Sequence, residues 1–257
     1  MKRAGLFPWG KAGLAFPFGF VFIAIGLICF GSGCTSSAKA ALINQKDPIA
    51  LVSMVSNLDI HWKDEEPVNP KGSNFLNRRA LRSDPDLTVT LTAEELIITA
   101  ETLFRNTMAD SGLINLAEKE MVVFSPAYQN ARINRYQEDW EMVKPENYRL
   151  VDFRDKSLFP VLASETGFQR FMFVEFYFTT AMGTGVGKLG TCLANTEMKV
   201  LILDAQGKTL FRKTVAEWSR STIKVKNGVY SRTAMMDLFE AAILEACHEF
   251  LYQVTDY

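Results

Sequence analysis

The most regular hydrophobic pattern in the chain lies between Phe168 and Thr180. Large apolar residues alternate there, so one side of an extended strand would carry Met172, Val174, Phe176 and Phe178. The other side is also largely apolar and would carry Phe171, Phe173, Glu175 and Tyr177. A strand with two apolar sides is typical of the centre of a sheet, so we expect a central strand that is covered on both faces.

Further strands are predicted on both sides of this run. A hairpin should combine residues 195–205 with residues 209–219, because Asp204 to Lys208 form a turn in which Gly207 suits a positive φ. A glycine-rich link, residues 183–190, joins the central strand to the hairpin. Near the start, Ile49 to Trp62 predicts another strand, since β-branched residues are frequent and apolar positions alternate toward its end.

Helical periodicity is clearest from Thr92 to Ser111. Thr92 and Glu95 have the spacing of a capping box, and Gly112 marks the end of the helix. A short helix that ends at Gly167 and a terminal helix with one apolar stripe are also predicted, at Leu158–Glu165 and Ser231–Val254.

Two segments have weaker patterns. Ile114 to Phe124 predicts a strand or a pair of strands, and the charged amphipathic segment from Tyr128 to Val143 predicts a surface helix. The order of strands and helices indicates an α/β or α+β fold, with a mixed sheet covered by helices in a single domain at residues 49–257.

The N-terminus has a different character. Lys2, Arg3 and Lys11 precede the apolar run Ala12–Phe30, and Gly31-Ser32-Gly33 then leads into Cys34. This arrangement resembles a bacterial lipoprotein signal, although Gly31 stands where Leu, Val or Ile is usual, as in the relaxed signals of spirochaete-like lipoproteins. The alternative is an uncleaved signal anchor, because the apolar run is just long enough to span a bilayer.

The resemblance implies that residues 1–33 are removed and that Cys34 is acylated. Several acyl chains on one residue would hold the protein on the membrane permanently. Residues 34–48 would then form a short tether. Because Thr35 and not aspartate follows the cysteine, the resemblance implies the outer membrane, with the folded domain facing the periplasm.

Composition narrows the function classes. The 257 residues carry a net charge of −1, and three of the 28 basic residues lie in the expected signal, so 25 remain against 29 acidic residues, a net charge of −4. Nothing in this balance suggests a nucleic-acid partner. Cys29 lies in the signal, while Cys192 and Cys247 remain, and whether those two form a disulfide stays open.

No set of residues predicts catalysis, a metal or a cofactor. The run Gly183–Gly190 lacks the spacing of a phosphate-binding loop, since Leu189 follows Lys188. His61 has acidic neighbours, but His61 and His248 are far apart in sequence and neither has the spacing of metal ligands. The long polar loop Lys63–Pro85 is a candidate contact for an acidic partner or an anionic surface, through Arg78, Arg79 and Arg82.

From Ile49 to Val254 the chain resembles the periplasmic fold of the CsgG and LpoB lipoprotein group. The resemblance rests on a short helix that ends in glycine, a hydrophobic strand, a glycine-rich turn and the hairpin strand Val200–Leu210 with its Asp-x-x-Gly-Lys turn. It implies a regulator or scaffold that binds another envelope protein without catalysis. A subunit of an oligomeric outer-membrane secretion channel is the first alternative, and an envelope hydrolase with an unrecognised site is the second. A homo-oligomer is compatible with both the scaffold and the channel.

Overall fold

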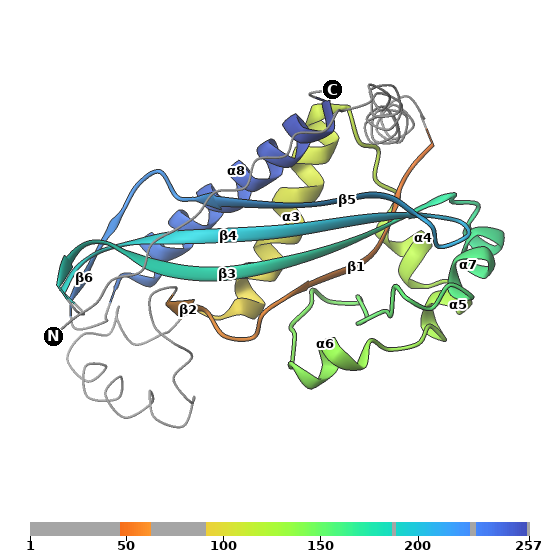
Figure 1. The fold of residues 1–257 in the computed structure, drawn as a ribbon, viewed down its shortest axis with the longest axis horizontal. Coiled ribbons are helices and arrows are strands. Elements are labelled where there is room, and N and C mark those ends of the chain that lie inside the picture. The colour runs from red at the N-terminus through yellow and green to blue at the C-terminus, as the bar shows by residue number, and fades with distance from the viewer. Residues whose placement is uncertain (1–46, 63–90, 187–188, 227–229, 256–257) are drawn as a thin grey trace, which may run out of the picture. The chain divides into compact units, whose positions relative to one another are not determined.

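The computed structural model describes residues 47–62, 91–186, 189–226 and 230–255. All of them belong to one compact unit, residues 36–257. In chain order (Figure 1), the elements are β1 (Ala50–Ser56), β2 (His61–Trp62), α3 (Ala93–Ser111), α4 (Lys119–Val123), α5 (Pro126–Gln129), α6 (Arg135–Asp139), α7 (Leu158–Thr166), β3 (Arg170–Val186), β4 (Leu189–Asp204), β5 (Thr209–Trp218), β6 (Ile223–Lys226) and α8 (Arg232–Thr255).

The strands form one mixed sheet in the order β1-β3-β4-β5, with β2 also paired to β3 and β6 also paired to β4. The short N-terminal strands β1 and β2 run parallel to β3, whereas β3, β4, β5 and β6 pair in antiparallel fashion. Helices pack on this sheet, so the predicted class, a mixed sheet covered by helices, is confirmed in its α+β form. The central position predicted for the strand at Phe168–Thr180 is confirmed as well.

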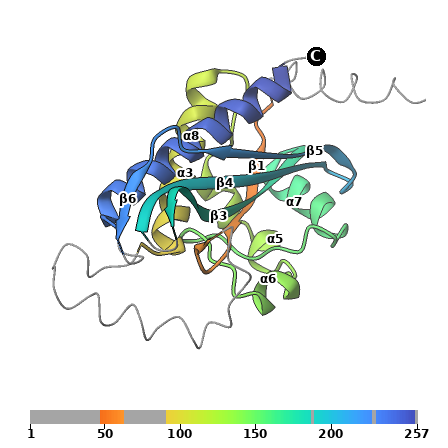
Figure 2. The same ribbon diagram turned by 60° about the vertical axis from the view of Figure 1, so that its left-hand side comes forward.

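One face of the sheet is buried under α3 and α8, which lie side by side in both views (Figures 1 and 2). Phe176 and Phe178 of β3 point to this face and are fully buried. The ring of Phe178 meets Phe239 of α8 at 5.7 Å between centroids, and Phe250 of α8 meets Phe211 of β5 at 5.8 Å. The alternation seen in the sequence therefore builds the main core directly.

The opposite face, which we call the open face, is covered only in part. Phe159 of α7 packs on Phe171 and Phe173 at the start of β3, with ring centroids 5.6 and 6.1 Å away. Farther along the strand, Glu175 and Tyr177 are only half-buried. Coverage on both sides is thus confirmed for the first part of the strand but not for the second.

The helix ends follow the local sequence. Thr92 and Glu95 form the predicted capping box, and Gly112 ends α3 in the left-handed conformation, as Gly167 ends α7. Gly207 has a φ of 71°, and a Cβ there would lie 2.8 Å from the ring of Phe159, so the β4–β5 turn needs glycine for two reasons. Within the described residues, no helix is both long and apolar enough to cross a membrane.

Two predicted elements were wrong. Residues 114–124 contain α4 and one isolated bridge, in which the backbone of Asn115 and Ala117 pairs with Ile49. The predicted helix at 128–143 is broken into α5 and α6, because Asn134 N–H donates to Leu150 at 2.6 Å and the intervening backbone pairs with the chain near Asp152. Tertiary backbone pairing overrides the local pattern in both cases.

The boundaries of two other predicted elements differ in the structure. The predicted strand at residues 49–62 is split into β1 and β2. Between them, the Asn57 side chain takes the place of backbone pairing: its Oδ1 accepts from Phe178 N–H at 2.7 Å and its Nδ2 donates to the Phe178 carbonyl at 2.9 Å. The glycine-rich link at 183–190 is mostly strand, since β3 runs to Val186 and β4 begins at Leu189, with a bulge between Met182 and Gly185.

Candidate binding groove on the open sheet face

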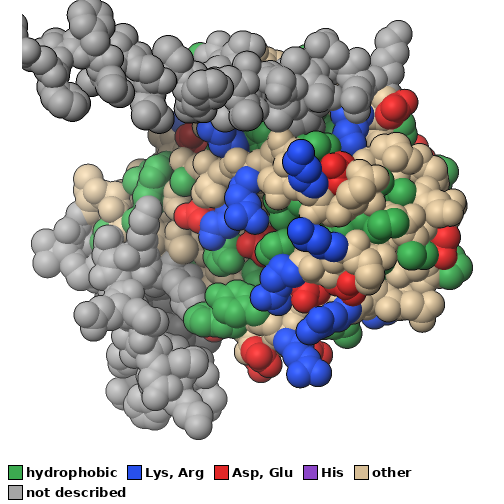
Figure 3. Space-filling view, turned by 45° about the vertical axis from the view of Figure 1, so that its right-hand side comes forward, with side chains coloured by type: hydrophobic (Ala, Val, Ile, Leu, Met, Phe, Trp, Pro, Cys, Tyr) green, Lys and Arg blue, Asp and Glu red, His purple; other side chains and the backbone are tan. Residues whose placement is uncertain are grey.

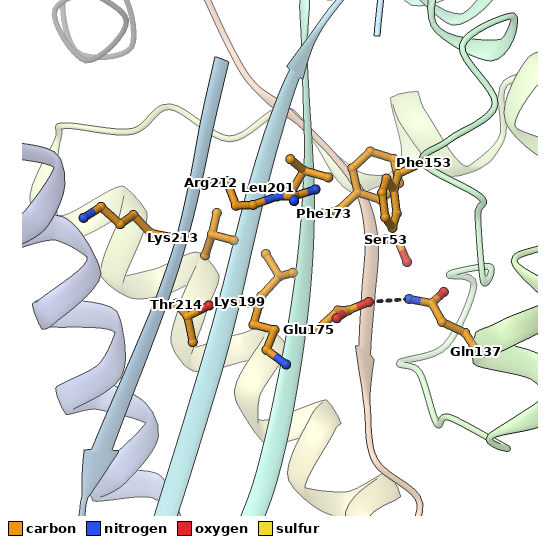
Figure 4. Close-up of a pocket in the computed structure, with 12 residues that line it drawn as sticks. Ser53, Gln137, Phe153, Phe173, Glu175, Lys199, Leu201, Arg212, Lys213 and Thr214 are labelled. Atoms are coloured by element: carbon orange, nitrogen blue, oxygen red, sulfur yellow. Dashed lines mark hydrogen bonds between the residues drawn. The ribbon is translucent and has the colours of Figure 1, made fainter. Parts of the chain in front are cut away.

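A groove of about 190 Å³ lies on the open face, across β1, β3, β4 and β5. Its floor is apolar, made by Phe173 of β3 and Leu201 of β4. One wall comes from Gln137 of α6 and Phe153 of the loop before α7, and the opposite rim is formed by Arg212 of β5 (Figure 4). The groove therefore combines residues as far apart in the sequence as Ser53 and Thr214.

Gln137 holds Glu175 at one end of the groove. Its Nε2 donates to Oε1 of Glu175 at 2.7 Å, the contact drawn as a dashed line in Figure 4. Because a carboxylate only accepts hydrogen bonds, this contact fixes the orientation of the amide. The Oε1 of Gln137 has no partner within the described part of the chain, although this residue is only 3% exposed. Glu175 is thus a fixed negative charge beside an apolar floor.

Asp152 fixes the wall that carries Phe153. Its carboxylate accepts from Nε and the backbone N–H of Arg154, at 2.8 and 3.1 Å, and lies 3.9 Å from Nε of Arg132. Burial alone would raise the pKa of Asp152, but the hydrogen bonds and charges of the two arginines outweigh burial and hold this pKa below its ordinary value. The Phe153 ring then packs edge-on against Phe173, 6.0 Å between centroids.

Two basic side chains belong to the strands of this face and differ in their contacts. Lys199 of β4 lies 3.1 Å from Oε1 of Glu197 and 4.1 Å from the ring centre of Tyr177. Arg212 has no ion pair or hydrogen bond with any described residue. In Figure 4 its side chain extends over β4 toward Phe173 and Phe153. Arg212 is therefore a guanidinium that is available to a ligand.

Aromatic side chains continue the surface beyond the groove. Tyr136 and Trp140 of α6 contact each other at 5.7 Å between ring centroids and are 57% and 66% exposed. Tyr177 of β3 is half-buried, and burial first, then the charges of Glu175 and Tyr136, raise the pKa of Tyr177 to about 12. We call Tyr136, Trp140 and Tyr177 the aromatic rim.

Basic and hydrophobic side chains lie beside each other on the molecular surface. In Figure 3, Lys and Arg side chains gather in a band across the visible face, with acidic side chains between them and hydrophobic side chains exposed beside the band. The groove and the aromatic rim, which combine aromatic and arginine side chains with a small apolar depression, have the composition of a protein recognition site.

Most residues singled out from the sequence lie elsewhere. Cys34 and the arginines Arg78, Arg79 and Arg82 fall outside the described residues, so their roles stay predictions. His61 belongs to β2, and His248 lies on α8 beside Glu217, Glu245 and Glu249 in a shallow depression. Burial, then the charges of Glu249 and Glu245, raise the pKa of Glu217. No group of three or more metal-binding side chains converges in the described ranges.

The remaining thiols are both free and buried. Cys192 lies on β4 and Cys247 on α8, and burial raises their pKa values to about 11 and about 12. A thiol with so high a pKa is a poor nucleophile at neutral pH, so both residues behave as small apolar groups of the core.

The groove residues were not predicted as a site. Glu175 broke the apolar alternation of its strand, which was the available signal for a functional position. Gln137, Trp140 and Arg212 lie in ordinary charged segments, and only the fold brings them to the same face as Glu175.

The similarities of this chain to known proteins lie among solved structures. No protein-family model matches the chain, and no curated protein matches it. Among solved structures, the chain is similar to the hypothetical protein CT253 from Chlamydia trachomatis, with 11% identity and a TM-score of 0.35 over 83% of this chain and all of that one. It is also similar to the LpoB C-terminal domain from Salmonella enterica, with 10% identity and a TM-score of 0.26 over 71% of this chain and 94% of that one. Both TM-scores lie below 0.5, so neither likeness carries an argument about this chain.

Proposed function

We propose that this protein is a lipid-anchored component of the cell envelope that binds a partner protein without catalysis, through the groove and the aromatic rim. The observation that supports the binding site is the exposure of Trp140 and Tyr136 next to a groove with an apolar floor. Tryptophan, tyrosine and arginine dominate the energetics of protein interfaces because they combine large apolar area with polar ends.

The size of the groove favours a macromolecular partner over a cofactor. Sites for drug-sized ligands enclose about 300 to 1,000 Å³. The groove holds about 190 Å³, which suits one or two inserted side chains with the rest of the contact on the rim. The groove would then act as an anchor point within a larger interface.

The anchor in this proposal comes from the sequence. Acyl chains on Cys34 would hold the folded domain close to the membrane, because only residues 35–49 separate Cys34 from β1. The outer membrane, facing the periplasm, is the location that we propose. Arg78, Arg79 and Arg82 would add contacts to an acidic partner, and reversing these charges should weaken crosslinking to it.

The test compares two exposed apolar residues on opposite sides of the sheet. Tyr136→Ala and Ile98→Ala each remove a side chain that is a little more than half exposed, but Ile98 lies on α3. Each full-length variant is expressed in the native cell with a photo-crosslinking residue at position 139, where Asp139 is exposed beside Trp140, and the crosslinked products are identified by mass spectrometry.

We expect wild type and Ile98→Ala to crosslink to the same envelope protein, and Tyr136→Ala to lose at least most of that product. Equal recovery from all three forms, or no protein product from wild type, would refute binding through the rim. Circular-dichroism melts establish that the variants are equally folded.

A further inference from the structure

The interior of the groove is apolar and favours an apolar group on the ligand. Phe173 and Leu201 form the floor, and both are nearly fully buried in the folded chain, while Phe153 closes one side. An inserted leucine or phenylalanine side chain would bury apolar area against these residues and displace water from the groove.

The end of the groove at Arg212 favours a negatively charged group on the ligand. Arg212 reaches over the floor without an ion pair in the described part of the chain, and a guanidinium binds a carboxylate with two parallel hydrogen bonds. Lys199 is less available, because it is already engaged with Glu197 and the Tyr177 ring.

The other end of the groove repels such a charge. Glu175 is held in place by Gln137 and presents its own carboxylate beside the floor. Lys199 lies opposite Glu175 in the β3–β4 ladder, but its ammonium is engaged with Glu197 and the Tyr177 ring. A ligand carboxylate near Glu175 would therefore still meet a like charge, whereas one near Arg212 would be attracted. The two ends therefore orient an acidic ligand in a single direction.

From these three observations we propose that the groove recognises a segment of the partner protein in which a large apolar side chain is flanked by a glutamate or aspartate. The apolar side chain fills the groove and the flanking carboxylate pairs with Arg212. This inference rests on the proposed function, since it names the chemistry of the partner at the same site.

The test uses synthetic peptides and a matched pair of protein variants. Fluorescein-labelled nonapeptides carry one central Phe and differ only in the flanking residues, which are Glu, Gln or Lys, and a fourth peptide has Glu flanks and a central Ala. Arg212→Gln and Lys213→Gln each remove one positive charge from adjacent positions of β5. Lys213 borders the groove as well, but Figure 4 shows its side chain pointing away from the groove toward α8. The full-length proteins are purified in neutral detergent, and binding is followed by fluorescence anisotropy.

We expect the Glu peptide to bind wild type about tenfold more tightly than the Gln peptide, as one charge-assisted contact provides. The Lys peptide and the central-Ala peptide should bind more weakly still. Arg212→Gln should abolish the preference for Glu over Gln, and Lys213→Gln should change it by less than about twofold. The preference should also shrink at high salt.

Other outcomes would overturn the inference. These are equal affinity for the Glu and Gln peptides, equal losses in the two variants, or no peptide binding at all. Binding to phosphatidylglycerol vesicles that depends on Arg212 would assign the groove to a lipid surface instead. Crosslinking at position 139 tests the proposed function separately, so a captured partner without peptide preference would refute only this inference.

Discussion

At the residue scale, Asp152 determines the shape of the groove without lining it. Its contacts with Arg154 and Arg132 hold the turn from which Phe153 reaches Phe173. A depressed pKa in the folded state means that Asp152 stabilises the fold above its ordinary pKa of 3.8, and that this stabilisation is lost as the pH falls through the lower folded value.

We therefore expect Asp152→Asn to lower the Tm at pH 7 by roughly 2–4 °C, equivalent to about 1 kcal/mol in a domain of this size. The difference from wild type should shrink as the pH falls below 3.8 and through the lower folded pKa, because Asp152 is then protonated in the folded state as well. Thermal melts at pH 7, 5 and 3 provide the check. A difference that stays constant across this range would mean that the charge of Asp152 is not responsible.

Phe176 contributes to stability through burial and not through charge, unlike Asp152. It is fully buried on the helix-covered face, where its ring stacks on Phe178 at 5.8 Å between centroids. Phe176→Asp should abolish folding, because an unpaired buried charge costs several kcal/mol against a net stability of about 5–15. A circular-dichroism melt measures this, with Phe176→Leu as a control that should still unfold cooperatively. A cooperative transition in the aspartate variant would place Phe176 outside the core.

At the scale of elements, the start of α3 is fixed by local contacts and by α8. Thr92 Oγ1 accepts from Glu95 N–H at 3.3 Å, Glu95 Oε2 accepts from Thr92 N–H at 3.1 Å, and Arg232 at the start of α8 donates to the same carboxylate. The cap therefore connects the ends of the two helices that cover the sheet.

Thr92→Ala should lower the free energy of unfolding by about 1 kcal/mol, the usual cost of losing a capping side chain. Thr92→Ser retains the hydroxyl and should stay within a few tenths of wild type. Urea denaturation of the three proteins measures the difference. If alanine and serine are equally destabilising, the methyl group of Thr92 matters and the cap does not.

The difference between local and distant contacts explains which elements could be predicted from the sequence. α3, α7 and the β4–β5 turn depend on residues within a few positions of each other, such as Thr92 with Glu95 or Gly207 in its turn. Residues 114–143 take their conformation from distant backbone partners, Ile49 and Leu150 among them, and local patterns hold no information on those pairs. Arg212 and Gln137 were missed as site residues for the same reason, since only the sheet brings them together.

At the scale of the whole molecule, the two faces of one sheet have separate roles. The face under α3 and α8 provides the main core, and the open face carries the groove, so neighbouring residues such as Glu175 and Phe176 serve different purposes. Substitutions at the groove should therefore alter binding with little effect on stability, which is what makes the peptide experiment interpretable.

The proposed anchor also belongs to this scale. Cys34→Ser should leave the precursor uncut and abolish labelling by radioactive palmitate, whereas Cys29→Ser should leave both unchanged. Labelling and mass are read from immunoprecipitated full-length protein after membrane fractionation. Undiminished labelling of the Cys34 variant would end the lipoprotein assignment.

The position of β5 at the end of the sheet has a further consequence. None of the described residues pairs with the outer edge of β5, so the backbone donors and acceptors of every second residue in this ten-residue strand are left for another chain. If two copies met edge to edge in antiparallel fashion, Arg212 and Lys213 of each would lie close to those of the other near the middle of the contact. For copies anchored in one membrane, as we propose, the mutual repulsion of these side chains would oppose edge-to-edge pairing, so the arginine that we propose for ligand binding would also keep the copies apart.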